Sequence, residues 1–418
     1  MTSRPAAAQS DRDGGAHRVV IVGGGVCGLE TLLGLQHLAG DRVHLTLISS
    51  EPEFTYRPLE VEEPFGLGPA GRTDLALLCR ELGADFLWQT VASVDGDGFV
   101  RLANDATASF DSLVLCPGAR LRAAFDRALS FPGPGRRFTV DELLREATGS
   151  LRVAFVIPPG VTWSLPLYEL ALMTERRGRT DGGIQIECCI ATPESAPLAM
   201  FGTAASTAVA ELLDVRGIEI LTGAYVRESE TESLTVSPAN RELEADIVVA
   251  LPILDGPEII GVPYDDNGFI SIDQHARVAG TGGTYAAGDA TNFPIKQGGL
   301  GTQQADAAAE HIAARAGADI EPAPFHPVLR GSLLTGPESL HMHHEIAGGA
   351  GEGEASSDYL WWPPHKIASR YLSAWLSDSY PREDPAPPVA PLDIEVALPS
   401  EWHRQPLALD PYAPLDSE

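Results

Sequence analysis

The chain has 418 residues, and its 58 acidic residues outnumber its 29 basic residues, which gives a formal net charge of −29. This length is too great for one compact core, so we expect two or three domains. So acidic a chain argues against a nucleic-acid partner, which requires basic side chains for its phosphates. Docking on an anionic membrane is disfavoured for the same reason.

The termini and the cysteines favour a cytoplasmic protein. Residues 1–18 are polar and lack the apolar core of a signal peptide, and no apolar run is long enough to span a bilayer. We expect a disordered arm over residues 1–16 and a Pro-rich acidic tail over residues 381–418. The five cysteines suggest neither a disulfide framework nor a zinc pair: Cys27, Cys79, Cys116, Cys188 and Cys189.

A strand, a glycine-rich turn and a helix follow the N-terminal arm. The apolar run His17–Val22 predicts a buried parallel strand, residues 29–38 predict a helix, and residues 43–48 predict a second strand. The turn carries the pattern Gly23-x-Gly25-x-x-Gly28. In a dinucleotide-binding unit the first glycine allows the turn, the second admits the pyrophosphate, and the third lets helix and strand pack closely.

Further cofactor-binding positions follow from this unit. Val26 and Cys27 lie inside the glycine turn, where the helix N-terminus faces the phosphates. The acid that binds the ribose hydroxyls should come after the second strand. Ser49 stands where that carboxylate often falls, so we assign the role to Glu51, two residues later.

Two later segments resemble motifs of two-dinucleotide flavoproteins, and this resemblance favours FAD over NAD. Residues 113–119 (LVLCPGA) resemble the segment with which these proteins cross the cofactor again, here through Cys116, Pro117 and Gly118. Residues 285–289 (YAAGD) resemble their late Gly-Asp motif, here Gly288 and Asp289, whose carboxylate would hold the ribityl and phosphate region. The glycine-rich stretch 298–301 then leads into a helix whose N-terminus, through Gly299 and Leu300, would face the flavin N1–C2=O edge.

With these motifs the chain resembles the pyridine nucleotide–disulfide oxidoreductase superfamily. It is most similar to the branch of sulfide:quinone reductases, flavocytochrome c sulfide dehydrogenases and type II NADH dehydrogenases, as residues 54–59 (FTYRPL) also indicate. The resemblance implies noncovalently bound FAD, with Arg57 and Val91 beside it. It implies an α/β fold with two Rossmann-like domains and a C-terminal α+β interface domain. The expected ranges are 17–130 with 269–324 for the FAD domain, 131–268 for an NAD(P)-binding-like domain, and 325–380 for the interface domain.

The second nucleotide domain departs from the family pattern. A glycine motif should follow its first strand, but residues 158–169 read PPGVTWSLPLYE. Proline offers no N–H to a phosphate, and Trp163 would fill space that glycine leaves empty. NAD(P)H binding is therefore disfavoured. The cysteine pair that sulfide oxidation requires is also missing, because Cys188 and Cys189 fall in a predicted strand.

Three residues are candidates for catalysis. Lys296 and Lys366 are the only lysines of an arginine-rich chain, and Lys296 stands in the turn before the helix that should face the flavin. Gln303 retains part of the glutamine pattern of type II NADH dehydrogenases. Residues 361–366 (WWPPHK) would cover the flavin or shape a substrate pocket, or they form an apolar lid. Residues 367–376 show a helical apolar face, and docking of this amphipathic segment on a membrane is a third alternative, which the overall acidity disfavours. His341, His343 and His344 are expected in a loop without a metal.

The function expected from these patterns is that of an FAD-dependent oxidoreductase in which the flavin is the sole redox centre. The donor is open, and the acceptor would be a quinone or another small molecule. One alternative is an NAD(P)H:acceptor oxidoreductase that binds the nicotinamide in an unusual way. Another is a flavin-binding partner subunit without turnover. A homodimer is a further candidate assembly.

Overall fold

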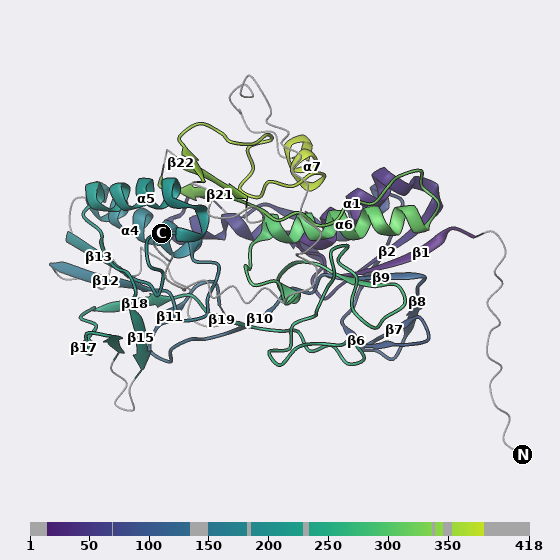
Figure 1. Ribbon diagram of the computed structural model, residues 1–418, viewed down its shortest axis with the longest axis horizontal. Coiled ribbons are helices and arrows are strands. Elements are labelled where there is room, and N and C mark those ends of the chain that lie inside the picture. The colour runs from purple at the N-terminus through teal and green to yellow at the C-terminus, as the bar shows by residue number, and fades with distance from the viewer. Residues whose placement is uncertain are drawn as a thin grey trace, which may run out of the picture.

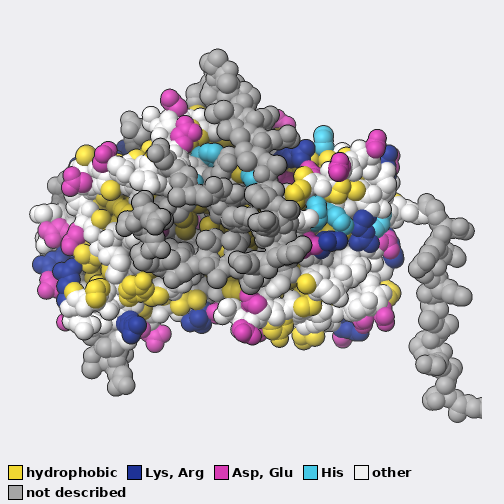
Figure 2. Space-filling model, in the orientation of Figure 1, with side chains coloured by type: hydrophobic (Ala, Val, Ile, Leu, Met, Phe, Trp, Pro, Cys, Tyr) yellow, Lys and Arg dark blue, Asp and Glu magenta, His cyan; other side chains and the backbone are white. Residues whose placement is uncertain are grey.

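The computed structural model describes residues 15–68, 70–133, 149–181, 185–228, 234–336, 339–345 and 353–379. Two parallel sheets with their helices form the two ends of an elongated molecule, and a C-terminal sheet and helix lie over the junction between them (Figure 1). This arrangement confirms the predicted α/β class with two Rossmann-like cores. On the face in Figure 2, acidic and basic side chains are interspersed along the rim.

The first sheet has the strand order β20-β9-β1-β2-β5 and is parallel throughout. Its strands are β1 (His17–Val22), β2 (Val43–Ser49), β5 (Asp85–Trp88), β9 (Ser112–Leu115) and β20 (Thr284–Ala286). Helices α1 (Val26–Ala39) and α6 (Gly298–Arg315) pack against each other on one face. Alanines at 305, 308 and 309 let α6 approach closely, and they join the core of β1 and α1 side chains.

Short elements complete this part of the molecule. An antiparallel sheet of β6 (Val91–Asp95), β7 (Phe99–Leu102) and β8 (Thr107–Ser109) covers the other face through a second apolar core. After the carboxyl ends of the strands of the first sheet come β3 (Glu53–Thr55), β4 (Arg72–Asp74), α2 (Leu75–Glu81), and the 3-10 helices η2 (Arg57–Phe65) and η4 (Gly288–Ala290). The 3-10 helix η1 (Gly40–Arg42) connects α1 to the amino end of β2.

The second sheet has the order β11-β18-β12-β13-β14 and is also parallel. Its strands are β11 (Leu129–Ser130), β12 (Ser150–Val156), β13 (Gln185–Ala191), β14 (Glu219–Leu221) and β18 (Ile247–Ala250). Beside it lie α4 (Leu165–Asp181), η3 (Ala199–Phe201), α5 (Thr203–Arg216) and a small sheet of β15 (Tyr225–Glu228), β16 (Leu234–Ser237) and β17 (Arg241–Glu242).

The crossings between the two parts lie slightly outside the predicted boundaries. The strands β10 (Arg120–Arg122) and β19 (Ile253–Asp255) pair antiparallel between the two sheets, and β11 joins the second sheet before residue 131. On the return, Ile260 bridges to Ser93 and Val262 enters the core of the first part. The chain is therefore back in the FAD part before the predicted boundary at 269.

Two local expectations for the C-terminal region were wrong. The sheet consists of β21 (Val328–Leu334), β22 (Ser339–Glu345) and β23 (Glu354–Ser356), so the three histidines lie in a strand and not in a loop. β22 pairs with β21, and these backbone hydrogen bonds keep the three histidines in a strand although their side chains are polar. The last helix, α7 (Leu372–Ser379), begins five residues later than Ile367, although Ile367 and Leu372 are both buried.

Candidate functional site

The predicted cofactor motifs meet at one edge of the first sheet. Strands β1, β2, β9 and β20 run parallel, so their carboxyl ends lie side by side. Gly23 follows β1, Glu51 follows β2, Cys116 follows β9 and Gly288 follows β20. Ligands of open α/β sheets bind at this edge, and the fold therefore gathers segments more than 250 residues apart in the sequence into a single site.

The glycine turn has the geometry of a phosphate cradle. Gly23 has a φ of +108°, and a Cβ atom there would lie 2.1 Å from the carbonyl oxygen of Cys116. A Cβ at Gly28 would lie 1.8 Å from the carbonyl oxygen of Gly23. At Gly25, by contrast, an added Cβ would meet no atom within 4 Å. Gly25 is also the N-cap of α1 and supplies no side-chain acceptor, so the first N–H groups face open space.

Asp289, like the glycine turn, indicates that a cofactor fits at this edge of the sheet. Its carboxylate accepts no hydrogen bond from the described residues, and burial raises its pKa, with Lys296 and Arg57 acting in the opposite direction. A half-buried acceptor without a donor calls for hydroxyl groups from outside the chain. The ribityl and ribose hydroxyls of FAD have this chemistry, so the residues present fit the cofactor.

Lys296 lies beside this carboxylate but is held by the backbone. Its ammonium donates hydrogen bonds to the carbonyl oxygens of Asp289 and Thr291 and stands 3.8 Å from the ring centroid of Phe269. Burial lowers the pKa of Lys296 to about 8, although the charge of Asp289 works against this. A role in tuning the flavin stays a prediction, and the structure places the charge near the motif that would hold the cofactor.

The N-terminus of α6 differs in detail from the expectation. The helix begins at Gly298 with Gln297 as its N-cap, and the Gln297 Oε1 accepts the N–H of Leu300 at 2.9 Å. That N–H is therefore already used, which removes the expected backbone contact of Leu300. Ile367 packs on Gly298, and a Cβ at Gly298 would lie 2.5 Å from its Cδ1. The C-terminal segment thus covers the helix end that should face the flavin.

Gln303 connects α6 to the C-terminal sheet, and its predicted role in catalysis stays a prediction. Its Nε2 donates to the carbonyl oxygens of Gly299 and Val328, both at 2.8 Å, and its Oε1 accepts the N–H of Val328 at 2.9 Å. Both amide hydrogens are consumed, so this side chain fastens β21 to α6. Its neighbour Gln304 accepts the N–H of Gly288 and thereby supports the Asp289 turn.

Lys366 lies at a junction of all three parts of the chain. Its ammonium donates to Glu169 on α4 at 2.6 Å and to the carbonyl oxygen of Pro58 in η2 at 2.8 Å. The two side chains are 8% and 0% exposed. Burial raises the pKa of Glu169, and the ammonium partly offsets this effect. Lys366 directly precedes Ile367 in the chain, and Ile367 covers Gly298 at the predicted flavin end of α6.

The remaining predicted cofactor residues lie around the same edge. Cys27 points its Sγ toward Gly288 and Gly301, where it packs α1 against the later motif. Pro117 is exposed, and Gly118 follows with a φ of +73°. Glu51 is exposed at the end of β2, and Val91 is half-buried at the start of β6. Val26 is half-buried at the first position of α1.

All five cysteines are described, and none forms a disulfide. Burial raises the pKa of the Cys79 thiol to about 11 and that of Cys116 to about 12. It also raises the pKa values of Cys27, Cys188 and Cys189. Thiols of this kind stay protonated and are poor nucleophiles. Among the described residues no cluster of histidine, cysteine and acidic side chains could hold a metal ion.

Two structural carboxylates escaped the sequence analysis. Glu30 on α1 accepts the backbone N–H groups of Arg370, Tyr371 and Leu372 at 2.7–2.8 Å. Asp306 on α6 hydrogen-bonds the same carboxylate, and burial beside Glu30 raises its pKa. In the sequence, each of these acids shows only as an acidic residue at a position of a predicted helix that should be buried. That pattern does not identify the group to which the acid hydrogen-bonds.

The glycine cradle, the Asp289 carboxylate that accepts no hydrogen bond within the described part of the chain, and the paired Rossmann-like cores define a two-dinucleotide-domain flavoprotein. The model of the pyridine nucleotide-disulphide oxidoreductase family matches residues 17–311, and the chain belongs to this family. This confirms the predicted family and cofactor, and the protein is an FAD-dependent oxidoreductase.

One relative is similar to the chain in sequence, and two solved structures are similar to it in fold. The chain is 26% identical over 268 residues to a sulfide-quinone reductase of Aquifex aeolicus (strain VF5), a match that covers 60% of this chain and 61% of that protein. The solved structure of the sulfide:quinone oxidoreductase from Aquifex aeolicus has a TM-score of 0.74 at 21% identity and covers 82% of this chain and 87% of its own. A NAD-dependent persulfide reductase from A. fulgidus has a TM-score of 0.58 at 16% identity, over 78% and 64% of the two chains.

Proposed function

We propose that this flavoprotein delivers electrons to a quinone and does not take them from NAD(P)H. The observation that carries the proposal is the buried Lys366–Glu169 pair next to the residue that covers α6. Reduction of a quinone to a quinol adds two electrons and two protons. Reduced FAD, when bound, would supply both electrons and one proton as a hydride, and the buried ammonium of Lys366 can polarise a quinone oxygen and donate the second proton to it. Glu169 keeps that ammonium in place.

Three further observations support this assignment. The matched relative carries the name sulfide-quinone reductase, which makes a quinone the natural acceptor to test. The segment from Pro158 to Pro166 offers prolines and a tryptophan where a nicotinamide dinucleotide needs glycine. The protonated thiols give no support to a cysteine relay from sulfide, so the donor is left open. No helix in the described part of the chain is long and apolar enough to cross a bilayer.

Anaerobic stopped-flow spectroscopy tests the proposal without knowledge of the donor. The flavin is first reduced by light and then mixed with decylubiquinone, menadione or NAD⁺, and its reoxidation is followed by absorbance. We expect the quinones to react at least about 100-fold faster than NAD⁺, and Lys366→Met to slow the quinone reaction by about 10–100-fold. Arg370→Met is the matched control, because Arg370 lies in the same segment but pairs with Glu310 at the surface.

The competing functions predict different results. Rapid bleaching of the oxidised flavin by NADH or NADPH would favour an NAD(P)H:acceptor oxidoreductase. A reduced flavin that reacts with none of these acceptors would favour a partner subunit without turnover. Equal rates for wild type and Lys366→Met would remove Lys366 from the quinone reaction.

A further inference from the structure

Glu194 occupies the place of a nucleotide-reading acid in the second domain. In a dinucleotide-binding unit, the carboxylate that takes the ribose hydroxyls stands just after the second strand. Here β12 is the first strand of the unit and β13 is the second, and they pair in parallel. β13 ends at Ala191, and Glu194 follows three residues later. The topology thus presents Glu194 at the position from which a ribose would be held.

Three hydroxyl groups of the chain already occupy this carboxylate. Ser164 Oγ donates to one oxygen at 2.9 Å, and Tyr168 OH and Thr192 Oγ1 donate to the other at 2.6 and 2.9 Å. All four residues are buried, and Tyr168 and Thr192 have no exposed surface. Burial raises the pKa of Glu194, while the three hydroxyl donors oppose that effect. Burial also raises the pKa of Tyr168, so its phenol keeps the proton that it donates.

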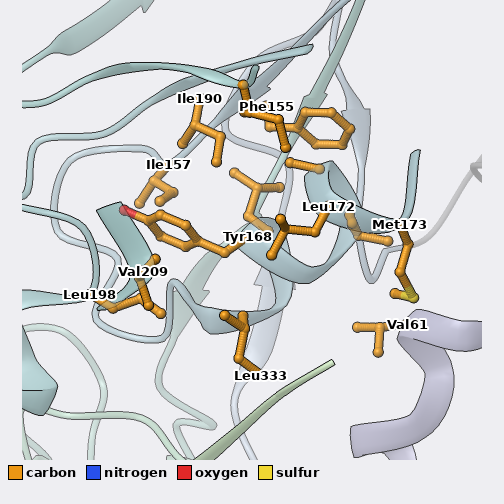
Figure 3. Close-up of a cluster of buried hydrophobic side chains, with 14 of the residues drawn as sticks. Val61, Phe155, Ile157, Tyr168, Leu172, Met173, Ile190, Leu198, Val209 and Leu333 are labelled. Atoms are coloured by element: carbon orange, nitrogen blue, oxygen red, sulfur yellow. The ribbon is translucent and has the colours of Figure 1, made fainter. Parts of the chain in front are cut away.

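The donors come from the segments that would otherwise hold the dinucleotide. Ser164 belongs to the proline-rich stretch that replaces the glycine turn, and Tyr168 lies in the first turn of α4, the helix whose N-terminus should face the phosphates. Figure 3 shows the Tyr168 ring lying among Ile157, Leu198 and Val209 inside the core. The space beside Glu194 is therefore filled with side chains.

We propose that Ser164, Tyr168 and Thr192 replace the ribose hydroxyls of a dinucleotide, so that Glu194 closes the second domain to NAD(P) from within. The two components reinforce each other: the carboxylate has no free oxygen for a ribose, and the phenol that satisfies it fills the adjoining volume. Glu194 is then a specificity-determining residue, because its carboxylate already accepts hydrogen bonds from three hydroxyls of the chain and cannot accept those of an NAD(P) ribose. The inference rests on the proposed function, for which it explains why the flavin takes electrons from a donor other than NAD(P)H.

Thermal unfolding with and without ADP-ribose tests this idea directly. The set comprises wild type, Glu194→Gln, Tyr168→Phe and the double variant, each with flavin bound and with ADP-ribose at millimolar concentration. We expect both single variants to lower Tm by several degrees, and the double variant to lower it by less than the sum of the two. ADP-ribose should shift none of the four. Glu187→Gln is the matched control, because Glu187 lies on the same strand but is exposed and pairs with Arg152.

Two results would overturn the inference. One is a rise in wild-type Tm with ADP-ribose that disappears in Glu194→Gln, which would show that Glu194 binds a ribose. The other is strict additivity of the two variants, which would show that the phenol does not act on this carboxylate. If Glu194→Gln does not fold, Tyr168→Phe removes one oxygen only and still reports both the Tm loss and the response to ADP-ribose. Failure of the quinone reaction would leave these results unaffected, so the two proposals fail separately.

Discussion

Lys366 and Glu169 form an ion pair across 197 positions of sequence, with 2.6 Å between the ammonium and the carboxylate. Glu169 also accepts the N–H of Leu334 in β21 through its other oxygen. One carboxylate thereby joins α4, the C-terminal sheet and the segment that covers α6. Because Lys366 bonds Pro58 as well, the pair connects both Rossmann-like parts to the C-terminal region.

Removing one partner of this pair should destabilise the protein strongly. Lys366→Met leaves Glu169 buried without a counter-charge, which costs about 3–5 kcal/mol. The double variant Lys366→Met/Glu169→Gln should recover part of that loss, because the buried group is then neutral. Thermal unfolding of the four proteins checks this. A double variant as unstable as the sum of its parts would mean that the two side chains do not interact.

Two glycine variants should separate cofactor binding from folding. At Gly25 an added Cβ meets nothing in the chain, so Gly25→Ala should fold but bind FAD weakly, and Gly25→Glu should bind none. At Gly28 the Cβ would meet the Gly23 carbonyl oxygen at 1.8 Å, so Gly28→Ala should damage the fold itself. The ratio of absorbance at 450 and 280 nm, read with circular dichroism, distinguishes the two. A yellow Gly25→Glu protein would contradict the cradle.

The Glu30–Asp306 pair should make stability fall as pH rises. Burial beside Glu30 raises the pKa of Asp306 far above its ordinary value of about 3.9. The folded state then keeps a proton that the unfolded state has lost. The stabilisation is complete below that ordinary value and declines with rising pH by up to about 1.4 kcal/mol per unit until the folded pKa is passed.

Asp306→Asn removes this titration and keeps a group that can donate to Glu30. Its advantage over wild type in urea unfolding should therefore grow between pH 5 and 8. Nearby Arg370 lowers the pKa of Asp306 and Glu310 raises it, both less than burial and Glu30 do, and Tyr371 lies beside them. Glu310→Gln should therefore change the slope much less than Asp306→Asn. If the free energy of unfolding depended on pH in the same way for wild type and Asp306→Asn, Asp306 would not hold a proton in the folded state.

The cysteines of β13 should be dispensable for electron transfer. Cys188 is buried in the core of the second sheet, and burial raises the pKa of Cys189 to about 11. The Cys188→Ala/Cys189→Ala variant should lose some thermal stability through lost packing but keep its flavin and its rate of reoxidation by a quinone. A folded, flavin-loaded variant without turnover would assign these thiols to the chemistry.

Lys296 should raise the flavin reduction potential in a pH-dependent manner. Its pKa is lowered to about 8, so its charge is present below that pH and lost above it. A nearby cation favours the extra negative charge of reduced flavin, so Lys296→Met should lower the midpoint potential by tens of millivolts at pH 6.5 and by little at pH 9.5. Arg152→Met, on the far domain, is the control for charge removal. Overlapping titrations would leave Lys296 as a loop tether.

The parallel strands and the cofactor edge could be predicted because their signals are local. Apolar runs bounded by glycine mark β1, β2 and β12, and parallel pairing then brings their carboxyl ends together without further information. The partners of Lys366 and Glu194 could not be predicted in this way. Both depend on hydrogen bonds between segments that lie far apart in the sequence. The sequence shows where a carboxylate stands but not which group donates a hydrogen bond to it.

The apolar pattern at 367–376 misled the helix prediction for a physical reason. The N–H of Ile367 is taken by the hydroxyl of Tyr56, and the N–H groups of residues 370–372 are taken by Glu30. Side chains thus replace the helical bonds of this stretch, while its apolar residues are buried as they would be in a helix. The catalytic role of Gln303 stays a prediction, and nothing in the sequence indicates that its amide is hydrogen-bonded to the backbone of Val328. Cytoplasmic location and the homodimer stay predictions.

Glu30 caps the start of α7 with a side chain from the first helix of the chain. During synthesis this carboxylate leaves the ribosome some 340 residues before the N–H groups that it binds. Until they arrive, α1 carries a buried acid without its donors, and α6 lacks the cover that Ile367 provides. The cap of α7 and the cover of the α6 N-terminus can therefore form only after the segment from Lys366 to Leu372 has been made.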